Sequence, residues 1–282
     1  MASRTALPGI LVDAAWVAAH RDEIVLADIR WYLDGRDGRT AFEAGHIPGA
    51  VYVDLDSVLS APEKGGTAGR HPLPTPEAFA RDMGALGIGE RDVVVAYDDA
   101  GGGTAGRLVV MLRLLGRDAA LLDGGMRAWP APLEQGPSAA RPPVTVAALP
   151  WPADRLPTAD DVAAAVASGV PVLDARAPER YRGEVEPIDA NAGHVPGARN
   201  EPWATNLDPS TGRFLPVDVL RARFEELGAR PDGQTIAYCG SGVSACMHVI
   251  ALEHSGLGGR LFVPSWSGWS ADPLRPVATG DR

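Results

Sequence analysis

Residues 44–50 have the sequence AGHIPGA, and residues 192–198 have the sequence AGHVPGA. Three further pairs of segments recur in the same order and at nearly the same spacing. VLADIR (25–30) matches PVLDAR (171–176), LGIGERDVVVAYD (86–98) matches LGARPDGQTIAYC (227–239), and LLDGGMRAW (121–129) matches LFVPSWSGW (261–269). Internal repeats of this kind indicate duplicated structural units. The sequence therefore predicts a tandem duplication that spans most of the chain.

Each half alternates strand and helix signals. Short, almost wholly apolar segments at 23–29, 92–97 and 119–123 predict buried strands, and 106–116 has the pattern of a helix. Asp13 and Thr75 are expected to cap helices, and Thr158 with Asp161 predicts a capping box. Apolar strands separated by helices are typical of a parallel sheet. We therefore expect an α/β fold in which two tandem domains each have a mostly parallel sheet with helices on both faces.

A proline-rich stretch separates the two halves. Residues 130–157 contain eight prolines, which restrict the backbone and remove hydrogen-bond donors. This composition predicts a semi-extended linker. We expect an N-terminal domain over 1–135, a linker over 136–156 and a C-terminal domain over 157–282.

Composition excludes several function classes. The chain has 282 residues, 45% of them hydrophobic and 22% charged, and its net charge of −10 argues against nucleic acid as a partner. No apolar run approaches the roughly 20 residues that span a membrane. Cys239 and Cys246 are too few for a disulfide framework or a metal site, so we expect no metal, no cofactor and a reducing, cytoplasmic location.

The two halves diverge where one predicted strand ends. Tyr97-Asp98 in the first half corresponds to Tyr238-Cys239 in the second, and the loop CGSGVS (239–244) then leads into a helix. Ligands of parallel sheets bind at such strand ends. Glycines at 240 and 242 allow backbone N–H groups to converge on the sulfur, which the helix dipole further favours as an anion. We expect Cys239 to be a thiolate nucleophile, and the alternative is a small buried hydrophobic residue.

These features resemble the tandem-domain rhodanese family of sulfurtransferases, and the resemblance covers nearly the whole chain. It implies two rhodanese-like domains, of which the first, with Asp98, is catalytically silent. It also implies that Cys239 takes the sulfane sulfur of a donor, becomes a persulfide and passes the sulfur to an acceptor, in a ping-pong scheme. The backbone of the active loop would stabilise that persulfide. The loop residues concerned are Gly240, Ser241, Gly242, Val243 and Ser244.

The loop sequence is similar to that of 3-mercaptopyruvate sulfurtransferases, whereas thiosulfate sulfurtransferases usually have basic residues there. Arg180 matches the family arginine that binds the anionic donor, and Arg182 is a candidate for the same role. Mercaptopyruvate enzymes typically have a second arginine in an E-P-R-D pattern. This chain has Glu186-Pro187-Ile188-Asp189 instead. Thiosulfate and 3-mercaptopyruvate therefore both stay open as donors.

The resemblance also implies a proton-transfer group. Ser241 would act with His71 and Asp56 of the first half, and its hydroxyl would carry a proton to the enolate of the departing pyruvate. The acceptor would be cyanide or a thiol, with thioredoxin as a candidate partner.

Other conspicuous residues are expected to be structural. His46 and His194 occur in both repeats, so we expect them to hydrogen-bond the turn before the next strand. Asp28 with Arg30, and Asp174 with Arg176, predict ion pairs inside each domain. We expect Cys246 to be a buried packing thiol. Trp266 and Trp269 are expected to form an apolar wall over the mouth of the cleft, with packing in the core as the alternative because Trp129 repeats only the second of them. The effect of Val263-Pro264 in place of the family's Asp-Gly is left open.

Two other function classes were weighed. A phosphatase loop has the pattern Cys-x5-Arg, but the sixth residue after Cys239 is Ala245, so this activity is disfavoured. The remaining alternative is a non-enzymatic module that carries a persulfide for a protein partner.

Overall fold

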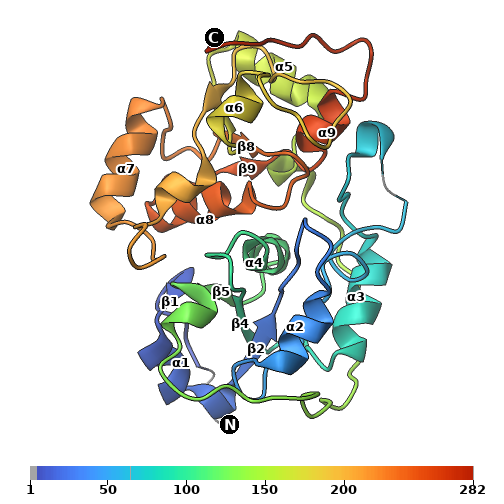
Figure 1. Cartoon of the computed structure of the whole chain (residues 1–282), viewed down its shortest axis with the longest axis vertical. Coiled ribbons are helices and arrows are strands. Elements are labelled where there is room, and N and C mark those ends of the chain that lie inside the picture. Colours follow the sequence, from blue (N-terminus) through green and yellow to red (C-terminus); the bar gives the residue numbers. More distant parts are fainter. Residues whose placement is uncertain (1–4, 64, 282) are drawn as a thin grey trace. The chain divides into compact units, whose positions relative to one another are not determined.

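The computed structural model describes residues 5–63 and 65–281. The chain divides into two compact units, and each unit includes one short segment from the other half of the sequence. The first unit contains Met1–Pro62, Pro74–Trp151 and Pro209–Arg213, and the second contains Glu63–Leu73, Pro152–Asp208 and Phe214–Arg282. The duplicated sequence thus folds as two α/β units (Figure 1).

The first unit has a five-stranded sheet in the order β1-β5-β4-β2-β3, and its strand pairs are parallel. Its strands are β1 (Leu11–Val12), β2 (Ile24–Asp28), β3 (Val51–Tyr52), β4 (Val93–Tyr97) and β5 (Ala119–Leu122). Its α-helices are α1 (Ala14–Ala19), α2 (Gly38–Ala44), α3 (Pro76–Ala85) and α4 (Ala105–Leu114), and the 3-10 helices are η1 (Arg21–Glu23) and η3 (Gly125–Ala128). The expected strands and helices of this half are confirmed.

The second unit has a four-stranded parallel sheet in the order β7-β6-β8-β9, which repeats the order β3-β2-β4-β5 of the first. Its strands are β6 (Val172–Asp174), β7 (Arg199–Asn200), β8 (Ile236–Tyr238) and β9 (Arg260–Leu261). Its α-helices are α5 (Ala159–Ala167), α6 (Pro178–Tyr181), α7 (Val217–Glu226), α8 (Cys246–His254) and α9 (Ser265–Trp269). Its 3-10 helices are η2 (Gly66–Ala68), η4 (Ala153–Arg155) and η5 (Trp203–Asn206).

The sheet of the second unit is buried on both faces, as the apolar strands predict. Alternate residues of a strand point to opposite faces, so Val172 and Leu173 of β6 enter different cores. Val172 packs with residues of α5 and α9, and Leu173 packs with residues of α7 and α8. Figure 1 shows α8 on one side of β8 and β9 and α5 on the other. The predicted layered arrangement is confirmed.

The helix starts follow the predicted caps. The Asp13 carboxylate accepts from the N–H of Trp16 at 2.7 Å, and the Thr75 hydroxyl accepts from Ala78 N–H at 3.2 Å. Thr158 and Asp161 form the expected reciprocal capping box at the start of α5. Because each cap satisfies N–H groups that have no partner within the helix, it fixes where the helix begins.

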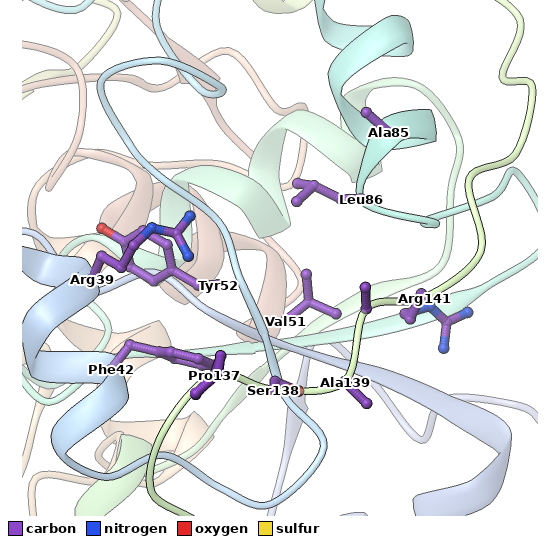
Figure 2. A pocket seen from close by; sticks show the side chains of 11 residues that line it. Arg39, Phe42, Val51, Tyr52, Ala85, Leu86, Pro137, Ser138, Ala139 and Arg141 are labelled. Atoms are coloured by element: carbon purple, nitrogen blue, oxygen red, sulfur yellow. The ribbon is translucent and has the colours of Figure 1, made fainter.

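The proline-rich linker lies along the first unit up to residue 151. Val144 N–H donates to Gly84 O at 2.9 Å, Ala147 N–H donates to a Glu90 oxygen, and Trp151 Nε1 donates to Pro74 O at 2.8 Å. Where residues 137–141 pass α2 and α3, they border a cavity of about 190 Å³ (Figure 2). Figure 2 shows Arg39 beside the ring of Tyr52. Over the described ranges, no helix has both the length and the apolar character needed to span a bilayer.

Candidate active site

Cys239 occupies the position that the sequence predicts, directly after β8 and before α8. β8 lies between β6 and β9, so the loop begins at the centre of the sheet's carboxyl edge. The Gly242 N–H donates to Cys239 Sγ at 3.2 Å, and Cys239 is 2% exposed. Val243 O and Ser244 O accept the N–H groups of Cys246 and Met247, which starts the helical turns of α8. The loop therefore brings a backbone donor to the sulfur.

The first turn of α9 holds the backbone of this loop. The N–H of Cys239 donates to Ser265 Oγ at 3.1 Å, and Ser265 Oγ donates to Phe262 O at 2.9 Å. Trp266 N–H donates to Cys239 O, and Ser267 N–H donates to Gly240 O, both at 2.9 Å. These bonds fix the Cys239 backbone from both sides. Ser265 was not among the predicted site residues.

Gly242 is required by its backbone conformation. Its φ is +76°, a region that residues with a Cβ atom rarely adopt, and a Cβ atom there would lie 2.3 Å from Val263 O. The Val263 carbonyl group therefore packs directly against Gly242 of the loop. Pro264 follows it as the residue that caps α9, with φ of −58°. This is the structural setting of the Val263-Pro264 pair.

The equivalent loop of the first unit encloses a carboxylate. Asp98 Oδ1 accepts from the N–H groups of Ala100 and Gly102 at 2.9 and 2.7 Å. Asp98 Oδ2 accepts from the N–H and hydroxyl of Thr104 and from Ala105 N–H, each at 2.9 Å. Loops of converging N–H groups bind anions, and this loop supplies its own. The loop of the first unit is thus arranged around an acceptor side chain at the position that Cys239 occupies in the second.

Arg180 lies beside the cysteine loop. A Cβ atom built on Gly240 would be 3.5 Å from Arg180 Nη1. Arg180 Nη2 donates to Glu186 Oε1 at 2.6 Å and lies 3.6 Å from Asp189 Oδ2. Burial acts to raise the pKa of Glu186, but hydrogen bonds from Arg180 and from backbone N–H groups hold that pKa below its ordinary value. Glu186 is therefore charged and orients the guanidinium.

A second arginine, Arg70, reaches the same point from the first half of the sequence. Its Nη2 would be 2.8 Å from a Cβ atom on Gly240, and its guanidinium is ion-paired with Asp189. Arg70 was not among the predicted site residues, although its neighbour His71 was a candidate. The available signal was the glycine-rich segment 65–69 that precedes it, which allows close packing.

The other candidate residues have different surroundings. Arg182 ends α6, and its Nε donates to exposed Glu184 at 2.7 Å. Ser241 and His71 are both buried and belong to the second unit, whereas Asp56 belongs to the first and accepts from Trp31 Nε1 at 2.6 Å. The structure thus assigns Ser241 and His71 to one unit and leaves the proton-transfer group a proposal.

The expectation for Trp266 and Trp269 is wrong. Both side chains lie in the core of the second unit, with exposed fractions of 0% and 2%. Trp266 Nε1 donates to Asn191 O and Trp269 Nε1 donates to Pro276 O, so each indole satisfies its polar group inside the unit. Because α9 is short and tightly packed, it turns both indoles inward.

The ion pairs expected in each unit are confirmed. Arg176 Nη2 donates to Asp174 Oδ2 at 2.6 Å and to Gly193 O at 2.7 Å, and Arg30 makes the matching bonds to Asp28 and Gly45. Cys246 is a buried thiol within α8, as expected.

The paired histidines are also buried, but they bind a different element from the one expected. His46 and His194 each pair a ring nitrogen with a carbonyl of the preceding helix, Phe42 O at 2.9 Å and Tyr181 O at 2.8 Å. The expected partner was the turn that follows. The helix carbonyl is favoured because each ring also stacks on that same helix residue.

The family model for the rhodanese-like domain matches residues 13–131 and 158–272. The chain belongs to the rhodanese family. Both copies of the rhodanese domain lie where the internal repeat places them.

Relatives of this rhodanese-family chain are similar over nearly its full length. A Pseudomonas aeruginosa protein named "Probable 3-mercaptopyruvate sulfurtransferase" is 44% identical, covering 96% of this chain and 98% of the relative. A Mycobacterium tuberculosis relative is named "Putative thiosulfate sulfurtransferase SseB". It is 40% identical, covering 96% of this chain and 97% of the relative. The crystal structure of SseA from Escherichia coli, a 3-mercaptopyruvate sulfurtransferase, has a TM-score of 0.78 and 30% identity, covering 92% of this chain and 99% of that chain.

The described part of this rhodanese-family chain contains no group of three or more His, Cys, Asp or Glu side chains arranged to hold a metal ion. The groups present at the loop are one thiol, backbone N–H groups, the hydroxyls of Ser241 and Ser244, and two neighbouring guanidinium groups.

Proposed function

We propose that this sulfurtransferase takes a sulfane sulfur from a small anionic donor, 3-mercaptopyruvate or thiosulfate, and passes it through a persulfide on Cys239 to a thiol or cyanide. The observation that carries the proposal is the 3.2 Å hydrogen bond from Gly242 N–H to Cys239 Sγ at the centre of the sheet edge. Hydrogen bonds to the charged form of a thiol favour ionisation. The names of the relatives support the two donors.

The first half-reaction forms a sulfur–sulfur bond. The Cys239 thiolate attacks the donor's outer sulfur. With 3-mercaptopyruvate a carbon–sulfur bond breaks and its electron pair leaves as the enolate of pyruvate, which then takes a proton. With thiosulfate a sulfur–sulfur bond breaks and sulfite leaves. Persulfide charge at Cys239 would be stabilised by the loop N–H groups, as the Asp98 charge is in the first unit.

The second half-reaction returns the thiolate. A thiolate or cyanide ion attacks the outer sulfur of the persulfide, and the bond to Cys239 Sγ breaks with its electron pair. Thioredoxin is the protein acceptor that we propose, and cyanide is the convenient one in an assay. Because the cycle needs a reduced Cys239, we also propose that the protein works in the cytoplasm.

Donor binding and proton transfer are assigned as the family resemblance implies. Arg180 would bind the anionic end of the donor, since its guanidinium lies beside Gly240. Arg182 is proposed as a second contact in the same segment. Ser241, oriented by His71 and Asp56, would give a proton to the pyruvate enolate and would be unnecessary when sulfite leaves.

The test is a cyanide assay in which thiocyanate is measured with each donor between pH 6 and 9. Cys239→Ser should abolish turnover because an alcohol cannot form the persulfide, and circular dichroism should show an intact fold. If the wild type forms no thiocyanate with either donor, while mass spectrometry still detects a persulfide on Cys239, the non-enzymatic carrier would be favoured instead.

The same assay separates the two donors. Ser241→Ala should reduce kcat with 3-mercaptopyruvate by about 100-fold or more, the size of a general acid–base contribution, and leave thiosulfate nearly unchanged. An equal loss with both donors would reject the proton-transfer group.

A further inference from the structure

We infer that Ser265 is a positioning residue for the sulfur chemistry of Cys239, because its hydroxyl holds the backbone N–H of the nucleophile and so fixes the direction of the sulfur. The inference rests on the proposed function and adds a residue that acts on Cys239 alone. Ser265 is fully buried, so its side chain cannot reach a donor in solution. Its hydrogen bonds, its backbone conformation and its counterpart in the first unit carry the inference.

The Ser265 hydroxyl connects the nucleophile to the core of the second unit. The N–H of Cys239 donates to Ser265 Oγ at 3.1 Å, and Ser265 Oγ donates to Phe262 O at 2.9 Å. A hydroxyl has one proton and two lone pairs, so giving the proton to Phe262 leaves a lone pair for the Cys239 N–H. Phe262 is fully buried, and its N–H donates to Ala237 O of the central strand β8 at 3.0 Å. The hydroxyl therefore ties the Cys239 backbone to the middle of the sheet.

This bond is one of two that fix the backbone of Cys239 on either side of its Cα atom. The other is the 2.9 Å hydrogen bond from Trp266 N–H to Cys239 O. With both backbone groups held, the position of Sγ depends on a single side-chain torsion, and Gly242 N–H donates to Sγ at 3.2 Å. Attack on a donor sulfur needs the attacking atom aligned with the bond that breaks, and small displacements reduce the rate steeply. Loss of the Ser265 hydroxyl would release the peptide group that precedes Cys239 and with it the aim of the sulfur.

The first unit shows which of these bonds belongs to the fold and which to the cysteine. Met126 N–H donates to Asp98 O at 2.8 Å, which matches the bond to the Cys239 carbonyl. Gly125 stands in the place of Ser265 and has no side chain that could accept the N–H of the preceding loop. The carbonyl bond is thus common to both units, whereas the hydroxyl bond is a feature of the unit that has the nucleophile.

The backbone conformation of Ser265 supports the same conclusion. Its φ is +53°, and φ of Gly125 is +56°, so the fold requires a left-handed residue at this place in both units. Glycine adopts that conformation without strain, and serine does not. Strain of this kind persists where the side chain supplies something that glycine lacks. At Ser265 the side chain supplies the acceptor for the Cys239 N–H.

The experiment measures how fast the persulfide forms on Cys239 in a single turnover with saturating donor. Ser265→Gly and Ser265→Ala both lose the hydroxyl, so the rate constant should fall by about 10-fold in both, the equivalent of one hydrogen bond, with KM little changed. The loss should be the same with thiosulfate and with 3-mercaptopyruvate, because Ser265 acts on the nucleophile that both donors share. The rate constant does not depend on the fraction of active protein, which the amplitude reports separately.

The pair of variants separates positioning from stability. Ser265→Gly relieves the backbone strain and Ser265→Ala keeps it, so the two should differ in stability but lose the same factor in rate. The matched control is Ser255→Ala, which removes another buried serine hydroxyl at the opposite end of α8, where it donates to Ala251 O at 2.8 Å. Its rate constant should equal that of the wild type.

Two results would overturn the role of Ser265 while the proposed function stands. One is a Ser265→Gly variant that forms the persulfide at the wild-type rate. The other is a loss of rate that follows stability, large in the alanine variant, small in the glycine variant and present in the Ser255→Ala control. A wild type that forms no persulfide from either donor would instead overturn the proposed function itself.

Discussion

Ser265 combines an unusual backbone conformation with a hydrogen bond to the backbone of Cys239. Among the non-glycine residues that the structure describes, Ser265 is the one with a positive φ, of +53°. Such a conformation costs about 1–2 kcal/mol and persists where the surroundings impose it. In the first unit the matching position of the repeat is Gly125, with φ of +56°, which avoids this cost. In the second unit Ser265 keeps the strained φ, and its hydroxyl oxygen accepts a hydrogen bond from the Cys239 N–H.

This contrast predicts an unusual ranking of two substitutions. Ser265→Ala leaves the Cys239 N–H without its acceptor and keeps the strained φ, so it should lower the free energy of unfolding by about 2 kcal/mol. Ser265→Gly loses the same hydrogen bonds but relieves the strain, so it should be about 1 kcal/mol more stable than the alanine variant. Urea unfolding measures both values. An alanine variant at least as stable as the glycine variant would show that the backbone is not strained.

Helix α8 carries the loop that bears Cys239, and a buried histidine attaches it to η5. His248 lies in the first turn of α8 and is fully buried. Its Nε2–H donates to Glu201 O at 2.6 Å, and Nδ1 accepts from Asn206 Nδ2 at 3.0 Å, an arrangement that needs the neutral ring. Burial lowers the pKa of His248 to about 4. The neutral form is thus part of the packing between α8 and η5.

The lowered pKa predicts a pH dependence of stability. In the unfolded chain the histidine titrates near 6.5, so the unfolded state binds the proton first as pH falls. The contribution is fully present above pH 6.5 and is lost progressively as pH falls toward 4, by about 3 kcal/mol in all. His248→Gln should reduce the slope of unfolding free energy against pH within that window. Equal slopes for variant and wild type in urea titrations from pH 4 to 7.5 would contradict the assignment.

The elements themselves were predictable because local chemistry determines them. Asp13, Thr75 and Thr158 cap helices by short-range hydrogen bonds, and short apolar segments rich in valine, such as 92–97, favour buried strands. The inward direction of Trp266 was not predictable, because a five-residue helix has no periodicity that identifies its buried face. Arg70 was missed for another reason. Its contact with Asp189 joins residues 119 positions apart, and one sequence contains no signal for such a pairing.

At the scale of the whole chain, the duplicated halves do not coincide with the compact units. Residues Glu63–Leu73 belong to the second unit and Pro209–Arg213 to the first. The second unit therefore depends on the first half of the sequence for Arg70 and His71. The second half of the sequence thus does not form its compact unit from its own residues alone.

The two loops also differ in how their N–H groups are satisfied. The Asp98 side chain fills the first loop, accepts its N–H groups and is wholly buried. In the second loop the corresponding side chain is a thiol, which receives the Gly242 N–H. The first loop is thus closed by its own carboxylate, and under the proposed function the second would hold the anion formed during the reaction.

Substitutions of Asp98 and of Cys239 should therefore change the stability of the whole protein by different amounts. Asp98→Asn replaces an acceptor oxygen by an amide that faces N–H donors, and it should lower the free energy of unfolding by about 3 kcal/mol or more. Cys239→Ser keeps a small acceptor at the Gly242 N–H and should change it by less than about 1 kcal/mol. Calorimetry and urea titration of both variants and the wild type measure these changes in the free energy of unfolding. Similar losses of unfolding free energy in the two variants would mean that the Cys239 loop depends on its own side chain as much as the Asp98 loop does. That result would contradict the proposal that the Cys239 loop is open to a persulfide.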